Sequence, residues 1–363
     1  MSRYQAVVAQ IDNSLKTLSH RVTLKDVARQ ANVHVTTVSL ALRGHPGISA
    51  PTRARISAIA TGLGYQRDPV LMALTSRRTG VHLPRRTQRM AFLTNHPDRA
   101  AIYGAPHMRY FFEGARRQAE AMGYSCDLLF VSETHLSSSM LEARLHDAEC
   151  EGIIIGAFNI PGETITLDWS RYAIVKIDSR FMEPAVVVVA NDQMQAVRLA
   201  YGRLYELGYR RIGMAVGLYD EAATRDLYAA GCLIEQAGVP PAERIPPLHF
   251  AYEERVQDVL PNLRSWVREH GVQVVISNWS EILPMAMATG LRVPDELACV
   301  CLCLSDPDPL VAGVVQNHLA VGRQAAEVLA LALKVGQRGI SPCPPAVYIA
   351  GHWQNGASAP PVR

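Results

Sequence analysis

The stretch TLKDVARQANVHVTTVSLALRGHPGISAPTRARISAIATGLGY (residues 23–65) decides the fold of the first part of this 363-residue chain. Its opening apolar residues recur at the spacing of one helical face, and Thr23 is placed to cap the first turn. Asn32 follows, and asparagine tolerates the left-handed conformation that ends many helices. The pattern predicts a short helix followed at once by a tight turn.

A second helix is predicted to begin at His34 or Thr36. The turn-forming residues GHPG separate it from a third helix over residues 51–63, for which Ser49 is a suitable N-cap. A tight turn sets the first two helices at a steep angle, so the second can present its N-terminal residues to a DNA major groove. The sequence therefore predicts an all-α helix-turn-helix headpiece with a supporting third helix.

Charge is divided unevenly along the chain. Residues 1–89 hold 14 lysines and arginines against 3 acidic residues, whereas residues 90–363 hold 22 against 30. A basic head on an acidic body indicates that the head meets a polyanion, with a solvated basic tail as the alternative. Hydrophobic residues make up 48% of the chain and charged residues 19%, which excludes a wholly disordered protein.

Side chains suited to DNA contact cluster at the start of the second helix. Hydroxyl groups there can bind bases or phosphates, and Val35 can contact a thymine methyl group. The outward residues are His34, Val35, Thr36, Thr37, Ser39 and Leu40. Phosphate contacts are expected from the neighbouring basic residues Lys25, Arg29, Arg43, Arg53 and Arg55. We therefore expect this segment to bind double-stranded DNA.

From residue 90 onward, short apolar runs alternate with amphipathic helical stretches. Strands are predicted at residues 90–94, 125–131, 152–157, 173–178, 186–190, 211–216, 272–277 and 298–304. Helices are predicted at residues 108–122, 139–148, 192–207, 221–237, 254–270, 281–289 and 319–335. Near-continuous apolar strands between helices favour parallel sheets covered on both faces. The segment is long for one sheet, so an α/β body of two lobes is predicted.

Residues 23–69 resemble the headpiece of LacI/GalR-type transcriptional regulators. Four segments carry the resemblance in order and without gaps: TLKDVA (23–28), VHVTTVS (33–39), ISAPTR (48–53) and LGY (63–65). Membership implies a two-lobed body similar to the type I periplasmic sugar-binding proteins. It also implies a homodimeric DNA-binding regulator, more often a repressor than an activator, whose operator is a pseudo-palindrome and whose allosteric control comes from a small ligand between the lobes.

The resemblance assigns roles to individual headpiece residues. Val35 and Thr36 should face bases. Residues that should approach the DNA backbone are Thr37, Ser39, Ser49, Thr52 and Tyr65, and Thr23 is counted in the same interface. His34 stands where the family usually has serine, and Leu40 stands where it usually has an arginine that reads guanine. Either the operator differs from the family's usual core, or readout shifts to His34 and Arg43; alternatively, Leu40 only packs.

A short apolar segment at residues 69–74 lies among basic and turn-forming residues. By resemblance it is a hinge helix that folds on DNA, and Leu74 is the leucine that enters the minor groove. The alternatives are a flexible linker or a dimer contact. The predicted divisions are an N-terminal extension (1–20), the headpiece (21–66), the hinge helix and linker (67–88), and a two-lobed effector-binding and dimerisation domain (89–363).

Several polar residues follow predicted strands of the body, where ligands of open α/β sheets bind. Carboxylates, amides and an aromatic face are the groups that bind a polyol, and here they are Asn95, Asp178, Asn278, Trp279 and Asp306. Alignment with the family adds Arg225 and Gln316. Trp279 replaces the usual aspartate, so the cleft is either a sugar or sugar-derivative site with a changed contact, a degenerate site, or a site read by a protein. Each residue alone is more often a cap or turn residue.

Other classes of protein find little support in the sequence. No apolar run reaches the roughly 20 residues of a membrane span, the N-terminus lacks a signal-peptide core, and a cytoplasmic protein with reduced thiols is expected. The nucleotide-binding, hydrolase and zinc-protease motifs are missing, so neither catalysis nor a metal or cofactor is predicted. The rivals are a solute-binding protein and a sugar-processing protein with an appended DNA-binding head.

Overall fold

The computed structural model describes residues 22–42, 47–63, 65, 88–131, 138–158, 165–178, 183–218, 224, 226–251, 256–279 and 281–362. The chain divides into two compact units, residues 1–84 and residues 85–363. The first unit contains the predicted headpiece, and the second contains the predicted α/β body.

The described part of the headpiece consists of α2 (Leu24–Ala31), α3 (Val35–Leu42) and α4 (Ala50–Gly62). Asn32 ends α2 in the left-handed conformation, with φ 50° and ψ 49°, as predicted. Ser49 is the N-cap residue of α4, also as predicted. The three helices bury a small common core formed by Val27, Ala28, Ala31, Val38, Ala41, Ile56 and Ala60. The helix-turn-helix prediction is confirmed.

The first lobe of the body is a parallel sheet with the strand order β11-β5-β4-β3-β1-β2. Its strands are β1 (Gln88–Thr94), β2 (Tyr124–Phe130), β3 (Cys150–Ile155), β4 (Ala173–Ile177), β5 (Val187–Asn191) and β11 (Ala346–Ile349). Its helices are α6 (Arg99–Gly104), α7 (Pro106–Ala121), α8 (Ser138–Asp147), the 3-10 turn η1 (Trp169–Arg171) and α14 (His318–Val335). Successive strand residues point to opposite faces, so Phe92 packs with α7 and α14 while Leu93 packs with α8.

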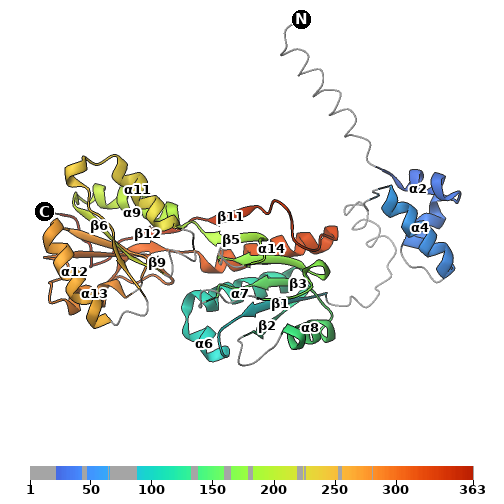
Figure 1. Cartoon of the computed structure of the whole chain (residues 1–363), viewed down its shortest axis with the longest axis horizontal. Helices are drawn as coiled ribbons and strands as arrows, with labels where there is room; N and C mark the ends of the chain where they lie inside the picture. Colours follow the sequence, from blue (N-terminus) through green and yellow to red (C-terminus); the bar gives the residue numbers. More distant parts are fainter. Residues whose placement is uncertain are drawn as a thin grey trace, which may run out of the picture. The chain divides into compact units, whose positions relative to one another are not determined.

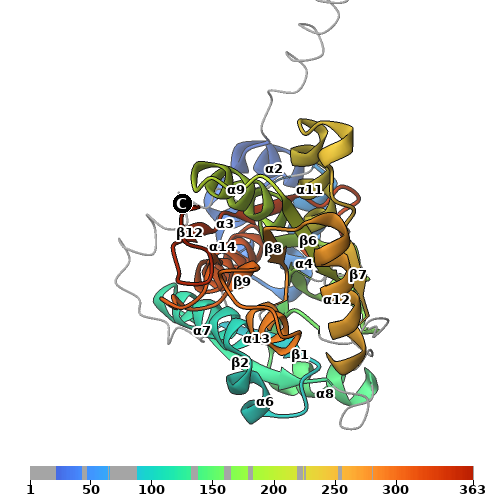
Figure 2. The same cartoon turned by 90° about the vertical axis from the view of Figure 1, so that its left-hand side faces the viewer.

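The second lobe has the strand order β12-β10-β9-β8-β6-β7, parallel except for the pair β10 and β12. Its strands are β6 (Ile212–Gly217), β7 (Leu248–Phe250), β8 (Val274–Ser277), β9 (Ala298–Leu304), β10 (Ala312–Val315) and β12 (His352–Gln354). Its helices are α9 (Gln193–Glu206), α11 (Leu227–Ala237), the 3-10 turn η2 (Pro241–Glu243), α12 (Val256–His270) and α13 (Ile282–Ala288). Helices α9 and α11 cover one face of this sheet, and α12 and α13 cover the other (Figure 2).

The chain passes between the two lobes at three places: from β5 to α9, from β10 to α14, and from β11 to β12 (Figure 1). The predicted fold class is confirmed, with an all-α headpiece and a two-lobed α/β body. Four short strands (β7, β10, β11 and β12) and the six-residue helix α6 were not predicted. These elements are too short to show a period, and β12 lies at a sheet edge.

Helices α7 and α14 pack with their backbones in contact. A Cβ atom added to Gly322 would collide with the carbonyl group of Phe111, and one added to Gly114 would collide with the carbonyl group of Leu319. Only glycine permits this approach, which joins a C-terminal helix to the N-terminal lobe. The core on this face of the sheet then includes Phe112, Val321 and Leu329.

We predict that Gly322→Ala lowers the free energy of unfolding of the body by about 1–3 kcal/mol, because the added methyl group forces the two helices apart. Gly202→Ala in α9 is the control, since open space surrounds that position and alanine should raise stability there by about 0.5–1 kcal/mol. Urea unfolding followed by circular dichroism measures both. Equal effects of the two substitutions would contradict the prediction.

Candidate functional site

Helix α3 presents a polar face opposite its buried side. Val38 and Ala41 are buried, whereas Thr36 is exposed. Leu40 is half-buried, yet it is not among the side chains packed against the headpiece core in the described residues. Thr36 and Leu40 are four residues apart and share one helical face. The geometry favours an outward role for Leu40 over the alternative that it only packs.

The side chain of His34 caps the first turn of α3. Its Nδ1 atom accepts a hydrogen bond from the backbone N–H of Thr36 at 3.3 Å and lies 3.0 Å from the hydroxyl oxygen of Thr36. A backbone N–H is always a donor, so Nδ1 is the acceptor and the ring proton is on Nε2. The imidazole thus does the capping that serine does more often, and it keeps one N–H donor free for a base or a phosphate.

Several of the remaining headpiece residues of the predicted interface lie at the starts of helices. Thr23 is the N-cap residue of α2, and its backbone N–H and hydroxyl both donate to Asp26 Oδ2 at 2.9 and 2.7 Å. The hydroxyl oxygens of Ser49 and Thr52 lie 2.8 Å apart at the start of α4. Tyr65 packs against the headpiece core. Val35 also packs against this core, in contrast to the outward position expected for it, while Thr37 and Ser39 are partly exposed.

Three predicted site residues lie outside the described residues: Arg43, Leu74 and Arg225. The hinge segment belongs to the same group. Their predicted roles stay predictions.

In the first lobe, Asn95 follows β1 and Asp178 follows β4, so both lie at the carboxyl edge of the sheet. Asn95 is buried. Asp178 adopts a left-handed conformation with φ 52°, and its Oδ1 accepts hydrogen bonds from the backbone N–H of Asn191 and from Gln193 Nε2. The carboxylate therefore ties the end of β4 to the start of α9.

In the second lobe, two of the predicted amides bind backbone. Asn278 joins the ends of β8 and β6, because its side chain accepts from Gly217 N at 2.9 Å and donates to Gly217 O at 3.3 Å. Gln316 donates to Leu302 O at 2.9 Å. The ring of Trp279 packs on that of Phe250, with centroids 4.9 Å apart. These contacts favour the alternative that Asn278, Gln316 and Trp279 have structural roles and do not bind an effector.

Asp306 makes a contact between the two lobes. The hydroxyl group of Tyr110, on α7 of the first lobe, donates to Asp306 Oδ1 at 2.5 Å, while Arg109 donates to the Tyr110 oxygen at 3.0 Å. The hydrogen bond to Asp306 raises the pKa of Tyr110, because it holds the proton on the phenol. Sequence reasoning did not find Tyr110, since the partner lies almost 200 residues away.

Three further polar residues at the carboxyl edge of the first lobe were also missed: His96, Asn191 and His318. All are buried, and His96 Nε2, Asn191 Oδ1 and His318 Nε2 have no hydrogen-bond partner. Asn191 ends β5, so the strand-end rule that singled out Asn95 could have found it. His318 begins a helix, and no sequence signal pointed to it. Buried polar atoms without partners are rare in proteins, so this group of residues is a candidate site for a ligand.

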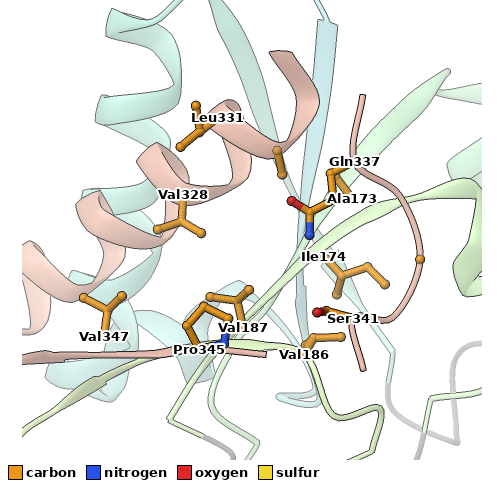
Figure 3. A pocket seen from close by; sticks show the side chains of 12 residues that line it. Ala173, Ile174, Val186, Val187, Val328, Leu331, Gln337, Ser341, Pro345 and Val347 are labelled. Carbon is orange, nitrogen blue, oxygen red and sulfur yellow. The ribbon is translucent and has the colours of Figure 1, made fainter. Parts of the chain in front are cut away.

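A separate pocket of about 270 Å³ lies in the first lobe (Figure 3). It is lined mainly by aliphatic side chains from β4, β5 and α14, with Gln337 and Ser341 as its polar side chains. It holds no charged group and none of the predicted effector residues. Within the described part of the chain, no cluster of three or more histidine, cysteine or acidic residues could hold a metal ion. No described helix is long and apolar enough to cross a membrane.

Residues 23–68 match the family model of the bacterial regulatory proteins of the lacI family. An uncharacterised helix-turn-helix transcriptional regulator of Streptomyces limosus is 29% identical over 202 residues, which are 53% of this chain and 52% of that relative. The chain thus spans about half the length of that curated relative.

Two solved structures share the fold. One is a complex of the transcriptional regulator CelR with cellobiose, with a TM-score of 0.53 and 19% identity over 93% of this chain and 100% of that chain. The other is the lac repressor dimer bound to operator and the anti-inducer ONPF, with a TM-score of 0.53 and 17% identity over 93% of this chain and 99% of that chain.

We predict that His34→Ala destabilises the first turn of α3 by about 0.5–2 kcal/mol, because the N–H of Thr36 loses its acceptor. His34→Ser should restore most of this loss. Hydrogen–deuterium exchange of the backbone amides of residues 35–42 in the full chain measures the effect. If the alanine variant exchanges as slowly as the unaltered chain, the imidazole is not the cap.

Proposed function

We propose that the chain acts as a LacI-type transcriptional regulator, a homodimer that binds a pseudo-palindromic operator and responds to a small-molecule effector. The match of residues 23–68 to the lacI family model supports this proposal. Repression is the expected direction of control. The observation that carries the DNA-binding proposal is the outward face of α3, with Thr36 and Leu40 free of the headpiece core and Nε2 of His34 available as a donor. The basic charge of residues 1–89 favours a polyanionic partner.

The DNA-binding proposal is tested by selecting sequences from a random duplex pool with the full chain. The selected site should have two-fold symmetry, because a symmetric dimer reads two half-sites. The affinity of the protein for this site should fall steeply as the salt concentration rises, because protein binding releases the cations that surround the DNA phosphates. Sedimentation of the protein with and without the selected DNA measures the stoichiometry. A selected pool without any common sequence would contradict sequence-specific binding.

We predict that Leu40→Arg moves the base preference at one position of each half-site toward guanine. A guanidinium can bind guanine through two hydrogen bonds, which discriminate by about 1–3 kcal/mol, whereas leucine cannot. Repeating the selection with the variant measures the change.

Ser57→Arg on the exposed side of α4 is the matched control, because it adds the same charge without adding it to α3. It should raise affinity for all sequences alike. If both variants select the original site, residue 40 does not face the bases.

We predict that Leu74→Ala weakens operator binding more than non-specific binding. By the family resemblance, this leucine wedges between base steps of a bent operator, and the bend brings contacts that straight non-specific DNA does not provide. Fluorescence anisotropy on the selected site and on a scrambled duplex measures both affinities. Equal losses on the two duplexes would contradict the wedge.

For the effector we propose a carbohydrate or a sugar derivative bound at the carboxyl ends of the body's strands. The fold likeness to a regulator solved with cellobiose supports a ligand of this kind, as do the buried polar atoms without partners. Binding must favour one arrangement of the lobes over another to change DNA affinity. The contact between Tyr110 and Asp306 is a contact that such a change would make or break.

The effector is sought by measuring the unfolding temperature against sugars, sugar phosphates and nucleobases. A ligand at about 100 times its dissociation constant stabilises the protein by roughly 2.7 kcal/mol. A second candidate is a regulator whose body no longer binds a small molecule, and the backbone-bound amides of Asn278 and Gln316 favour it. The absence of any shift across the panel would support that candidate.

A further inference from the structure

Two long helices of the first lobe begin without a side-chain cap. Helix α7 has 16 residues and Ala105 as its N-cap, and helix α14 has 18 residues and Asn317 as its N-cap; neither residue makes a capping side-chain hydrogen bond. The Asn317 amide instead donates to Ala350 O at 2.6 Å. The first N–H groups of a helix have no partner within the helix and carry the positive end of its dipole.

The two helix starts are neighbours, and each carries a histidine. His107 is the second residue of α7 and His318 the first of α14, with ring centroids 6.0 Å apart. His318 is only 5% exposed, and its Nδ1 lies 3.1 Å from Asn191 Nδ2. With the amide nitrogen as donor, Nδ1 accepts and the ring proton is on Nε2. This Nε2 has no hydrogen-bond partner, so a buried N–H donor is left at the start of α14.

The histidines of this cluster are uncharged at neutral pH. Burial lowers the pKa of His318 to about 3, with His107 as a second cause, and it lowers the pKa of His107 to about 4, with His96 as the second cause. The His107 residue itself is nevertheless exposed. The ring of His107 lies 6.4 Å from that of Phe111, measured between ring centroids.

Most of the ionisable groups near the cluster already have partners. Asp178, which bonds the backbone of Asn191, also accepts from Gln193. Asp192 caps α9 through the N–H of Gln195. On α7, Arg109 donates to Tyr110. Pro106 has no N–H, so the donors at the start of α7 are the N–H groups of the residues that follow it. No side-chain hydrogen bond caps the start of α7 or of α14.

We infer that the adjoining starts of α7 and α14 bind an anionic group, a phosphate or a carboxylate, carried by the effector. Uncapped N–H groups and a buried imidazole N–H are the donors that bind such oxygens, and the helix dipoles favour negative charge at this position. A hydroxyl group would accept from one donor and leave the positive helix ends unmatched. This inference rests on the proposed effector role of the body, and it narrows the effector from sugars in general to acidic or phosphorylated ones.

The test is calorimetric titration of the full chain with inorganic phosphate, glucose 6-phosphate, glucuronate and glucose. At least one of the anions should bind, and an anionic sugar should bind at least tenfold more tightly than glucose. The phosphate and carboxylate arms show which acid the site prefers. The inference is wrong if no anion binds, or if glucose binds as tightly as its charged counterparts.

Variants of the two helix starts locate the site. His107→Ala, at an accessible position, should weaken binding of the preferred anion about tenfold, whereas His146→Ala should not change it, because His146 lies exposed in the last turn of α8 in the same lobe. Ala105→Asp places a carboxylate at the N-cap of α7, where it would occupy the free N–H groups and repel an anion, so it should abolish binding. The neutral cap in Ala105→Asn should weaken binding less.

Unfolding temperature and DNA affinity are measured on the same samples. A folded Ala105→Asp protein that still binds the anion as tightly as the unaltered chain would overturn the inference. A chain that binds its selected DNA but none of the anions would overturn it while leaving the proposed DNA-binding function standing. Loss of sequence-specific DNA binding in the unaltered chain would overturn the proposed function instead.

Discussion

Burial of both faces of each parallel sheet is the constraint on which the body depends. Residues such as Phe92 and Leu93 pack into opposite cores, so both faces of the first sheet are mainly apolar. Polar side chains gather instead where strands end. In the second lobe, some of these side chains join the ends of neighbouring strands, as Asn278 does for β8 and β6. Near the carboxyl edge of the first lobe, buried atoms of His96, Asn191 and His318 remain without hydrogen-bond partners.

Much of the architecture was predictable because it depends on local patterns. Strand β9 was predicted with its observed bounds, since all seven of its residues are apolar and turn residues flank it. Helix α7 begins two residues before the predicted start, at Pro106, because proline is well suited to the first helical turn. Strands β10 and β12 each have three or four residues and are held by pairing with a neighbour. Such strands depend on tertiary pairing, which single-sequence periodicity does not report.

The candidate site residues also differ in how far local sequence patterns predict them. Thr36 and Leu40 were expected to face outward from helical spacing alone, and they do not join the headpiece core. The capping role of His34 depends on a rotamer, and the contact of Tyr110 with Asp306 depends on how two lobes meet. The neighbours of His318 come from α7 and β5, which are distant in sequence. A rule about strand ends finds the edge of a sheet but not the helix starts that lie beside it.

The contact of α14 with α7 also determines the order in which the protein can be completed during synthesis. Phe111 and Gly322 meet although roughly 200 residues separate them, and contacts of this kind form slowly. The headpiece, in contrast, closes its core within residues 27–60. A growing chain therefore holds a finished DNA-binding head long before its first lobe is covered, with Phe112 and Met108 still lacking the helix that shields them. Until α14 is present, that apolar surface is open to solvent and prone to aggregation.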